Sequence, residues 1–253
     1  MIVLSVANQK GGVGKTTLTA HLAYSALEAG LKVLLVDLDK QGSLSLTFAV
    51  DDAVPGLLAS RLFDAEVPRT KPEAISPQLA IIRADNGLLA IDKAENEVIK
   101  RPGQTLRKIG RDFDLCLIDT PPLLGVRSLA ALTASNYVVT PVSIGLYELA
   151  GVADLIQTIH VVRTQGFNPA LKHLGIQLMK TNPRSKESRA AVLDLREAYG
   201  DAILPDELPE REAVRQAVAQ RKPVWVSTRG DSHRKAAIEW RAACETIIER
   251  ATK

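Results

Sequence analysis

Cysteine is scarce in this chain of 253 residues, which contains only Cys116 and Cys244. Two thiols cannot build a disulfide framework or a zinc site of four thiolates. Cys116 lies inside an apolar run, so we expect it to be a small core residue rather than a redox group. These features exclude disulfide-rich scaffolds and cysteine-based metal proteins.

Long apolar runs are missing as well. No stretch approaches the ~20 apolar residues of a membrane span, and the N-terminus is strand-like rather than a charged leader with an apolar core. We therefore expect a cytoplasmic protein without a membrane partner. The net charge of +3 is mildly basic, which permits binding to nucleic acid without predicting it. The 46% of hydrophobic residues and the chain length are typical of a globular protein with a substantial core.

A glycine-rich turn near the N-terminus is the most specific feature of the sequence. It reads Gln9-Lys10-Gly11-Gly12-Val13-Gly14-Lys15-Thr16-Thr17. It joins an apolar run at 2–7 to a helical pattern at 18–27, and a phosphate-binding loop requires this strand–turn–helix context. The glycines let backbone N–H groups converge at a helix N-terminus, where the helix dipole favours an anion. Lys15 would then reach the β- and γ-phosphates of ATP, and the Thr16 hydroxyl would hold Mg²⁺.

Aspartates end two apolar runs that we predict to be buried strands. The run at 32–37 ends in Asp37, with Asp39 two positions later, and the run at 114–119 ends in Asp119. Ligands of an open parallel sheet bind beyond the carboxyl ends of its strands, where these side chains would lie. One carboxylate of the Asp37–Asp39 pair would face a metal while the other orients water, although an isolated Asp-x-Asp is often two solvated loop residues. Asp119 ends a Walker B arrangement, in which the aspartate reaches Mg²⁺ through water.

The turn at 9–17 resembles the deviant Walker A motif of the ParA/MinD family of ATPases, because a second lysine, Lys10, precedes the glycines. The Asn8-Gln9 lead-in is similar to the ParA (Soj-like) branch, since MinD proteins usually have glycine in place of Gln9. The resemblance extends from residue 2 to about residue 248. It implies a single ATPase domain over residues 1–253.

Two later segments carry the same resemblance. Residues 37–42 are similar to the family's D-x-D-P-Q-G motif, with Lys40 in place of the proline, and residues 119–125 resemble its D-T-P-P-S-L-G switch. The family pattern implies that Asp39 acts in hydrolysis and that Lys10 crosses to the nucleotide of a second subunit, as an arginine finger does. We therefore expect Lys10, Lys15 and Asp39 to be catalytic. Thr16 and Asp119 would hold Mg²⁺, with Asp37 as a further candidate.

The family also implies partners. We expect an ATPase that dimerises on ATP, binds double-stranded DNA non-specifically, associates with the nucleoid, and drives plasmid or chromosome partition with a ParB-like protein. The alternatives are a MinD-like membrane-cycling regulator and a McdA-like positioner of a protein cargo. DNA contacts would come from basic residues of the C-terminal part, although acidic residues interleave with them and a solvated surface is the alternative. These residues are Arg189, Arg196, Arg211, Arg215, Arg221 and Lys222.

Two residues are candidates for the adenine end of the nucleotide. Asn182 follows a predicted strand and offers a paired donor and acceptor suited to a purine edge. An asparagine before a proline is also a common turn former, so both interpretations stand. Pro205 ends the last predicted strand, 202–205, after which family members close over the base.

The remaining pattern alternates strands with helices. It predicts a doubly wound α/β fold of the P-loop NTPase type, with a mostly parallel sheet and helices on both faces. The segment 143–151 resembles the one that opens a long helix in the family. Residues 64–78 are expected to form an irregular loop. Predicted helices cover residues 56–63, 88–99, 102–111, 127–134, 152–165 and 232–250, and further strands cover 79–83, 137–142 and a segment from 174.

Overall fold

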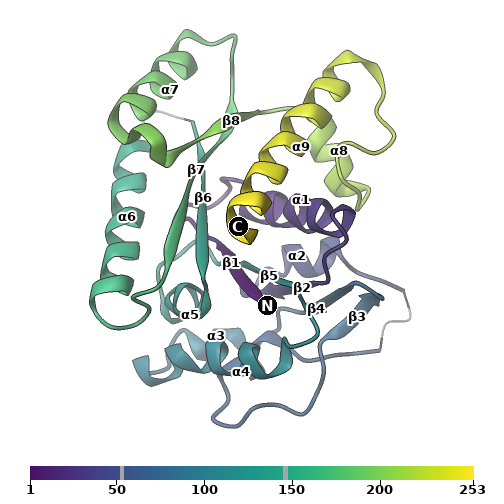
Figure 1. Ribbon diagram of the computed structural model, residues 1–253, viewed down its shortest axis with the longest axis vertical. Helices are drawn as coiled ribbons and strands as arrows, with labels where there is room; N and C mark the ends of the chain where they lie inside the picture. The colour runs from purple at the N-terminus through teal and green to yellow at the C-terminus, as the bar shows by residue number, and fades with distance from the viewer. Residues whose placement is uncertain (52–53, 145–147) are drawn as a thin grey trace.

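The computed structural model describes residues 1–51, 54–144 and 148–253, and its centre is a sheet of eight strands (Figure 1). Part of the segment 143–151, namely residues 145–147, lies outside the described residues. The spatial order is β3-β4-β2-β5-β1-β6-β7-β8, and every pair is parallel except β3 with β4. The strands are β1 (Ile2–Val6), β2 (Val33–Asp37), β3 (Glu73–Ser76), β4 (Leu79–Ile82), β5 (Leu115–Asp119), β6 (Tyr137–Ser143), β7 (Lys172–Thr181) and β8 (Ile203–Pro209).

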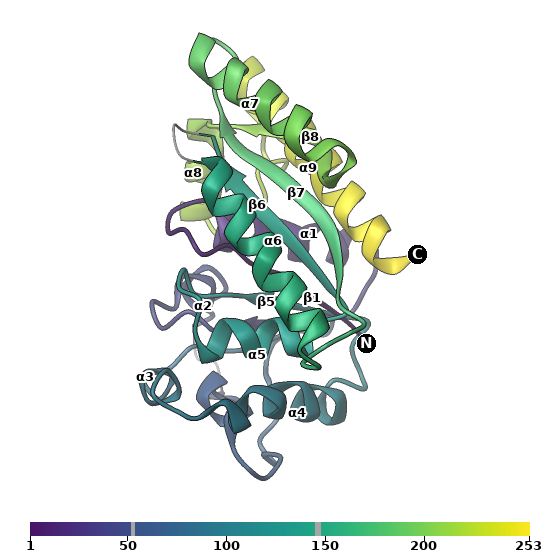
Figure 2. The same ribbon diagram turned by 90° about the vertical axis from the view of Figure 1, so that its left-hand side faces the viewer.

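Helices cover both faces of this sheet. Figure 2 shows α4, α5, α6 and α7 on the face toward the viewer, with α1 and α9 behind the strands. The helices are α1 (Lys15–Glu28), α2 (Ser43–Thr47), α3 (Leu88–Ile91), α4 (Arg101–Ile109), α5 (Val126–Ala134), α6 (Glu148–Thr164), α7 (Lys186–Tyr199), α8 (Glu212–Ala219) and α9 (Gly230–Thr252). The predicted doubly wound α/β fold is confirmed.

Alternating side chains of the central strands divide the core into two layers. Leu35 and Leu117 pack with α1 and α9, whereas their neighbours Leu34 and Cys116 pack with α4 and α5. A strand directs successive side chains to opposite faces, so a sheet that is covered twice needs the continuous apolar runs seen in the sequence. Every residue of β2 and β5 is buried. Their only acidic residues are the last ones, Asp37 and Asp119, which places both carboxylates at one edge of the sheet.

The predicted helix over 88–99 is wrong. Helix α3 ends at Ile91, and a separate 3₁₀ turn, Asn96–Lys100, follows it. The carboxylate of Asp92, the residue after α3, accepts hydrogen bonds from Arg127 Nε and Nη2 at 2.7 and 2.8 Å. This ion pair with α5 fixes the chain where the helix ends, and helical spacing does not reveal it.

Three further segments differ from the prediction. The segment at 56–63 contains a 3₁₀ turn, Ala59–Phe63, and the expected irregular loop contains β3, which pairs antiparallel with β4. The last strand, β8, extends to Pro209 rather than ending at Pro205. A side chain of β7 binds the polar middle of β8, since Gln177 Nε2 donates to the Asp206 carbonyl at 2.8 Å. Two acidic residues in this edge strand conceal its length in the sequence.

Candidate functional site

The glycine-rich turn connects β1 to α1 and opens into a cleft of about 700 Å³. Gly12 and Gly14 have φ values of 73° and 98°, in the left-handed region that residues with a Cβ rarely adopt. A Cβ on Gly14 would lie 2.9 Å from Met179 Cε, so this position is also sterically restricted. The turn can therefore wrap around an anion at the start of α1.

Lys15, the first residue of α1, points back toward the turn. Its side chain is buried, and its Nζ donates to the Lys10 carbonyl at 3.0 Å. Burial lowers the pKa of Lys15, while the charges of Asp119 and Asp39 oppose this shift. The ammonium thus lies among carboxylates at the wall of the cleft, where it can meet a phosphate.

Asp119 and Thr16 form the most constrained pair in the site. Thr16 Oγ1 donates to Asp119 Oδ2 at 2.6 Å. The other oxygen, Oδ1, is buried and has no hydrogen-bond partner among the described residues. Burial first, and the charge of Asp37 second, raise the pKa of Asp119 to about 8. An orphaned carboxylate oxygen beside a threonine hydroxyl fits Mg²⁺, which prefers oxygen ligands and keeps several waters.

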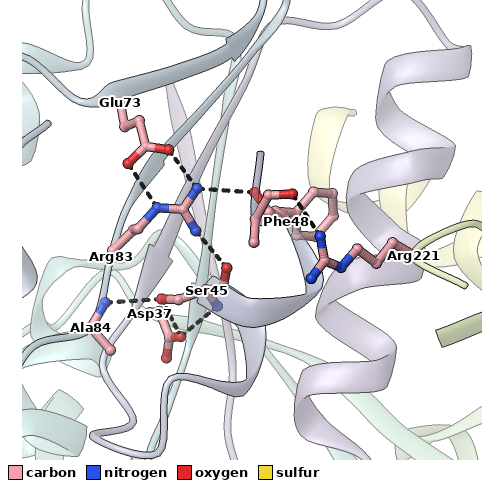
Figure 3. Close-up of polar contacts among 8 residues, drawn as sticks. Asp37, Ser45, Phe48, Glu73, Arg83, Ala84 and Arg221 are labelled. Atoms are coloured by element: carbon pink, nitrogen blue, oxygen red, sulfur yellow. Dashed lines mark hydrogen bonds and ion pairs between the residues drawn. The ribbon is translucent and has the colours of Figure 1, made fainter. Parts of the chain in front are cut away.

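Asp37 and Asp39 have separate positions. Asp39 lines the cleft, and one of its oxygens accepts the Gln41 N–H at 3.1 Å. The candidate metal ligand Asp37 instead is buried, with Oδ2 accepting the N–H and hydroxyl of Ser45 at 2.8 and 2.7 Å (Figure 3). Asp37 Oδ1 accepts the Asp39 N–H at 3.1 Å. With both oxygens engaged by the protein, Asp37 supports the Asp39 loop rather than facing the cleft.

The Asp39 loop is braced from a second direction by Arg83, which follows β4. Figure 3 shows its guanidinium between Glu73 and the end of α2. It donates to both Glu73 oxygens and to the carbonyls of Ser45 and Phe48. Arg221 donates to the neighbouring Ala49 carbonyl at 3.1 Å, which connects α2 to the segment after α8.

The other end of the cleft contains residues that the sequence did not indicate as nucleotide contacts. It is lined by Met179, Lys180, Leu208, Pro209, Glu210 and Arg211. These residues lie where β7 and β8 end. The sequence indicated this end of the cleft only through the general expectation that ligands bind beyond the carboxyl ends of parallel strands.

The two adenine candidates are not in this cleft. Asn182 lines a separate groove beside α7, and its Oδ1 accepts the Arg184 N–H at 3.1 Å. Pro205 is exposed in the middle of β8. Pro209, at the true end of that strand, lies where Pro205 was expected, because β8 is four residues longer than its apolar part.

The basic residues expected to contact DNA lie on or beside two different helices. Arg189 and Arg196 lie on α7, and the others lie at or after the start of α8 (Figure 1). Arg211 pairs with Glu239, Arg215 pairs with Glu212 and Arg196 pairs with Glu207. Arg189 and Arg221 donate to the carbonyls of Pro183 and Ala49, which leaves their charge unneutralised by these contacts.

Lys10 is exposed next to the cleft, and its backbone N–H donates to Asn8 Oδ1 at 2.8 Å. Asn8 Nδ2 in turn donates to the Pro141 carbonyl at 2.7 Å. Gln9, which replaces the usual first glycine, donates from Nε2 to Thr158 Oγ1 at 3.1 Å. A backbone carbonyl of β6 and a side chain of α6 thus hold the start of the loop. None of the described helices is long and apolar enough to cross a membrane.

Known proteins resemble this chain along most of its length. The AAA domain family model matches residues 1–173. Protein IncC of Escherichia coli is 34% identical over 252 residues, 98% of this chain and 69% of IncC. The chromosome-partitioning ATPase Soj of Treponema pallidum is 34% identical over 228 residues, 87% of this chain and 88% of Soj. The chain belongs to the ParA/Soj family of partition ATPases.

The fold of this ParA-family chain also matches a solved structure that contains a nucleotide. Cobyrinic acid a,c-diamide synthase from Mycobacterium smegmatis, with bound ADP and magnesium, superposes with a TM-score of 0.80 at 29% identity. The match covers 98% of this chain and 94% of the synthase chain. The predicted P-loop NTPase fold of the ParA-family chain is thereby confirmed.

Proposed function

We propose that this ParA-family chain is an Mg²⁺-dependent ATPase, a single domain over residues 1–253, that dimerises on binding ATP. The dimer binds double-stranded DNA without sequence preference, and a ParB-like partner stimulates hydrolysis to move a plasmid or chromosome. One observation carries the proposal: Lys15, Thr16 and Asp39 line the cleft of the glycine-rich turn, and the buried Asp119 accepts the hydrogen bond of the Thr16 hydroxyl. Relatives named for partition reach 34% identity, above the 29–31% of the synthase, and therefore favour this activity over a synthase reaction.

Each residue of the site has a separate role in the proposed hydrolysis. Backbone N–H groups from Gly11 to Thr17 hold the phosphates, and Lys15 leaves the Lys10 carbonyl to neutralise the γ-phosphate. Thr16 and Asp119 would hold Mg²⁺, which would supply charge stabilisation to the phosphates. Asp39 accepts a hydrogen bond from the attacking water and orients it in line with the leaving oxygen.

Lys10 acts in trans in this proposal. It precedes the glycines and is exposed, so a second subunit facing the cleft can receive its ammonium at the γ-phosphate. The triphosphate then stabilises the dimer, and loss of the γ-phosphate removes the charge that attracts each Lys10. A symmetric dimer doubles the number of basic residues that can contact one DNA duplex, so dimerisation raises DNA affinity.

The test measures DNA binding with ATP, with ADP and without nucleotide over a series of salt concentrations. We expect tight binding with ATP only, with log affinity falling linearly with log salt because phosphate contacts release counterions. Asp39→Ala should bind DNA with ATP and remain bound, because it dimerises without turnover. Lys15→Ala is the matched control, since it should lose nucleotide and DNA binding together. DNA affinity that is equal in all three nucleotide conditions would contradict the proposal.

A further inference from the structure

Lys180 occupies an irregular position at the end of β7. Met179 pairs with Leu208 and Thr181 pairs with Pro209, so Lys180 is one extra residue between two consecutive pairs of the β7–β8 ladder. Its φ is 53°, in the left-handed region, which is unusual for a residue other than glycine, asparagine or aspartate. A β-bulge of this kind redirects a side chain and is common beside active sites.

The bulge directs two consecutive residues to the same loop. Met179 Cε lies against Gly14, where a Cβ would be 2.9 Å away, and Lys180 Nζ donates to the Gly12 carbonyl at 2.7 Å. In a regular strand, neighbouring side chains point to opposite faces and only one of the two would reach the loop. The left-handed backbone is unfavourable for lysine, so a specific contact must hold it in place.

A backbone carbonyl does not neutralise an ammonium group. Lys180 has three N–H donors, and the contact with Gly12 uses one of them. The side chain is exposed and lines the same cleft as Lys15 and the glycines. A phosphate beside Gly12 can therefore accept a charge-assisted hydrogen bond from Lys180 while the contact with the carbonyl is kept.

We propose that Lys180 is a third cationic group of the nucleotide site, which binds the phosphate nearer to the nucleoside. This inference rests on the proposed ATPase function. The strand order supports the assignment to that phosphate. Asp39 follows β2 and Asp119 ends β5, both on one side of β1, whereas β7 lies two strands away on the other side. Lys180 thus contacts a group shared by ATP and ADP, and it is a binding residue rather than one that acts on the γ-phosphate.

The test compares three variants with the wild-type protein by calorimetric titration of Mg-ADP and by steady-state hydrolysis of Mg-ATP. Lys180→Asn removes the charge but tolerates the left-handed backbone, and Lys180→Arg retains the charge. Lys172→Asn, at the start of the same strand, is the matched control. We expect Lys180→Asn to raise the Kd for ADP and the KM for ATP about tenfold with kcat within about twofold, since binding energy common to ground and transition states affects KM. Lys180→Arg and Lys172→Asn should remain within about threefold of the wild type.

Salt dependence separates a charge contact from a purely structural one. The difference in Kd between the wild type and Lys180→Asn should shrink at about 0.5 M salt, because an exposed ammonium is screened. Equal ADP affinity of the wild type and Lys180→Asn at low salt would overturn the inference, and so would a loss of kcat with unchanged KM. If the wild-type protein binds neither ADP nor ATP, the proposed function itself fails.

Discussion

Among single residues, Asp119 shows most clearly that the site lowers the stability of the folded protein. Its carboxylate is buried, one of its oxygens has no hydrogen-bond partner in the described parts of the chain, and its pKa of about 8 lies well above the 3.8 of an ordinary aspartate. The folded protein therefore holds a proton that the unfolded chain releases at lower pH. The contribution of Asp119 to the unfolding free energy is therefore fully present below about pH 4 and is lost as the pH rises toward 8. A bound cation would offset this penalty, which agrees with a metal position beside Asp119.

Replacing Asp119 by asparagine should therefore stabilise the protein while it abolishes hydrolysis. We expect the unfolding free energy to rise by about 2 kcal/mol at pH 8, because the ionised form is no longer buried. The gain should disappear near pH 4.5, where the wild-type carboxyl is protonated. Urea unfolding at both pH values, in the presence of a chelator and without nucleotide, measures the effect. A stability loss at pH 8 would contradict this account of Asp119.

His21 has the opposite pH dependence. It lies on α1 one turn after Thr17, with Nδ1 at 2.8 Å from the Thr17 carbonyl and Nε2 accepting the Val224 N–H at 3.2 Å. Burial lowers its pKa to about 4, below the ordinary 6.5, so the unfolded chain binds a proton more readily than the folded protein. Its contribution to stability is present above about pH 6.5 and is lost as the pH falls through 4.

We predict that acid unfolding of the wild type depends in part on His21. The imidazole should account for a loss of roughly 3 kcal/mol in unfolding free energy between pH 7 and pH 4. His21→Gln keeps a donor and an acceptor without titrating, so its stability should vary less over this range. Denaturant unfolding at each pH provides the comparison. Parallel pH profiles of the two proteins would exclude His21 as an acid-sensitive group.

On the scale of elements, α2 depends on neighbours that are distant in sequence. This helix has five residues and follows directly after the Asp39 loop. Arg83 donates to the Ser45 carbonyl within α2 and to the carbonyl of Phe48, the residue after it, and the buried side chain of Glu73 binds Arg83 in turn (Figure 3). A helix of this length is not stable by itself, so tertiary contacts must hold it.

Arg83→Met should destabilise the protein by about 3 kcal/mol, because it leaves the buried Glu73 carboxylate unpaired. The double variant Arg83→Met with Glu73→Gln should recover part of this loss, since the buried charge is removed as well. Thermal unfolding of the single and double variants gives the coupling free energy between Arg83 and Glu73. Additive effects of the two substitutions would mean that the pair does not act as a unit.

On the scale of the whole molecule, the proposed dimer can be tested by mixing two inactive variants. Lys10→Ala retains Asp39, and Asp39→Ala retains Lys10. In a mixed dimer, the Lys10→Ala subunit receives Lys10 from its partner and has a complete site. An equal mixture should therefore recover about a quarter of the wild-type turnover, because half of the dimers are mixed and each has one working site. A mixture as inactive as its components would show that Lys10 acts within its own subunit.

The sequence by itself determined the parts whose physics is local. The Gly12–Gly14 turn needs glycine for its left-handed backbone, and the apolar runs that end in Asp37 and Asp119 place those carboxylates at one edge of a parallel sheet. The P-loop NTPase fold and family follow from these residues. A pattern of three motifs in order also predicted the cleft that Lys15, Thr16 and Asp39 line.

Only the tertiary structure decided how groups far apart in sequence share their hydrogen bonds. Both oxygens of Asp37 accept hydrogen bonds from Ser45 and Asp39. Helix α3 ends just before Asp92, which pairs with Arg127. Lys180 donates to the Gly12 carbonyl, 168 residues earlier in the chain. Periodicity describes which face of an element is apolar, whereas such contacts depend on strand order and register. The end of the last strand was misplaced for this reason, because the length of β8 depends on its pairing with β7.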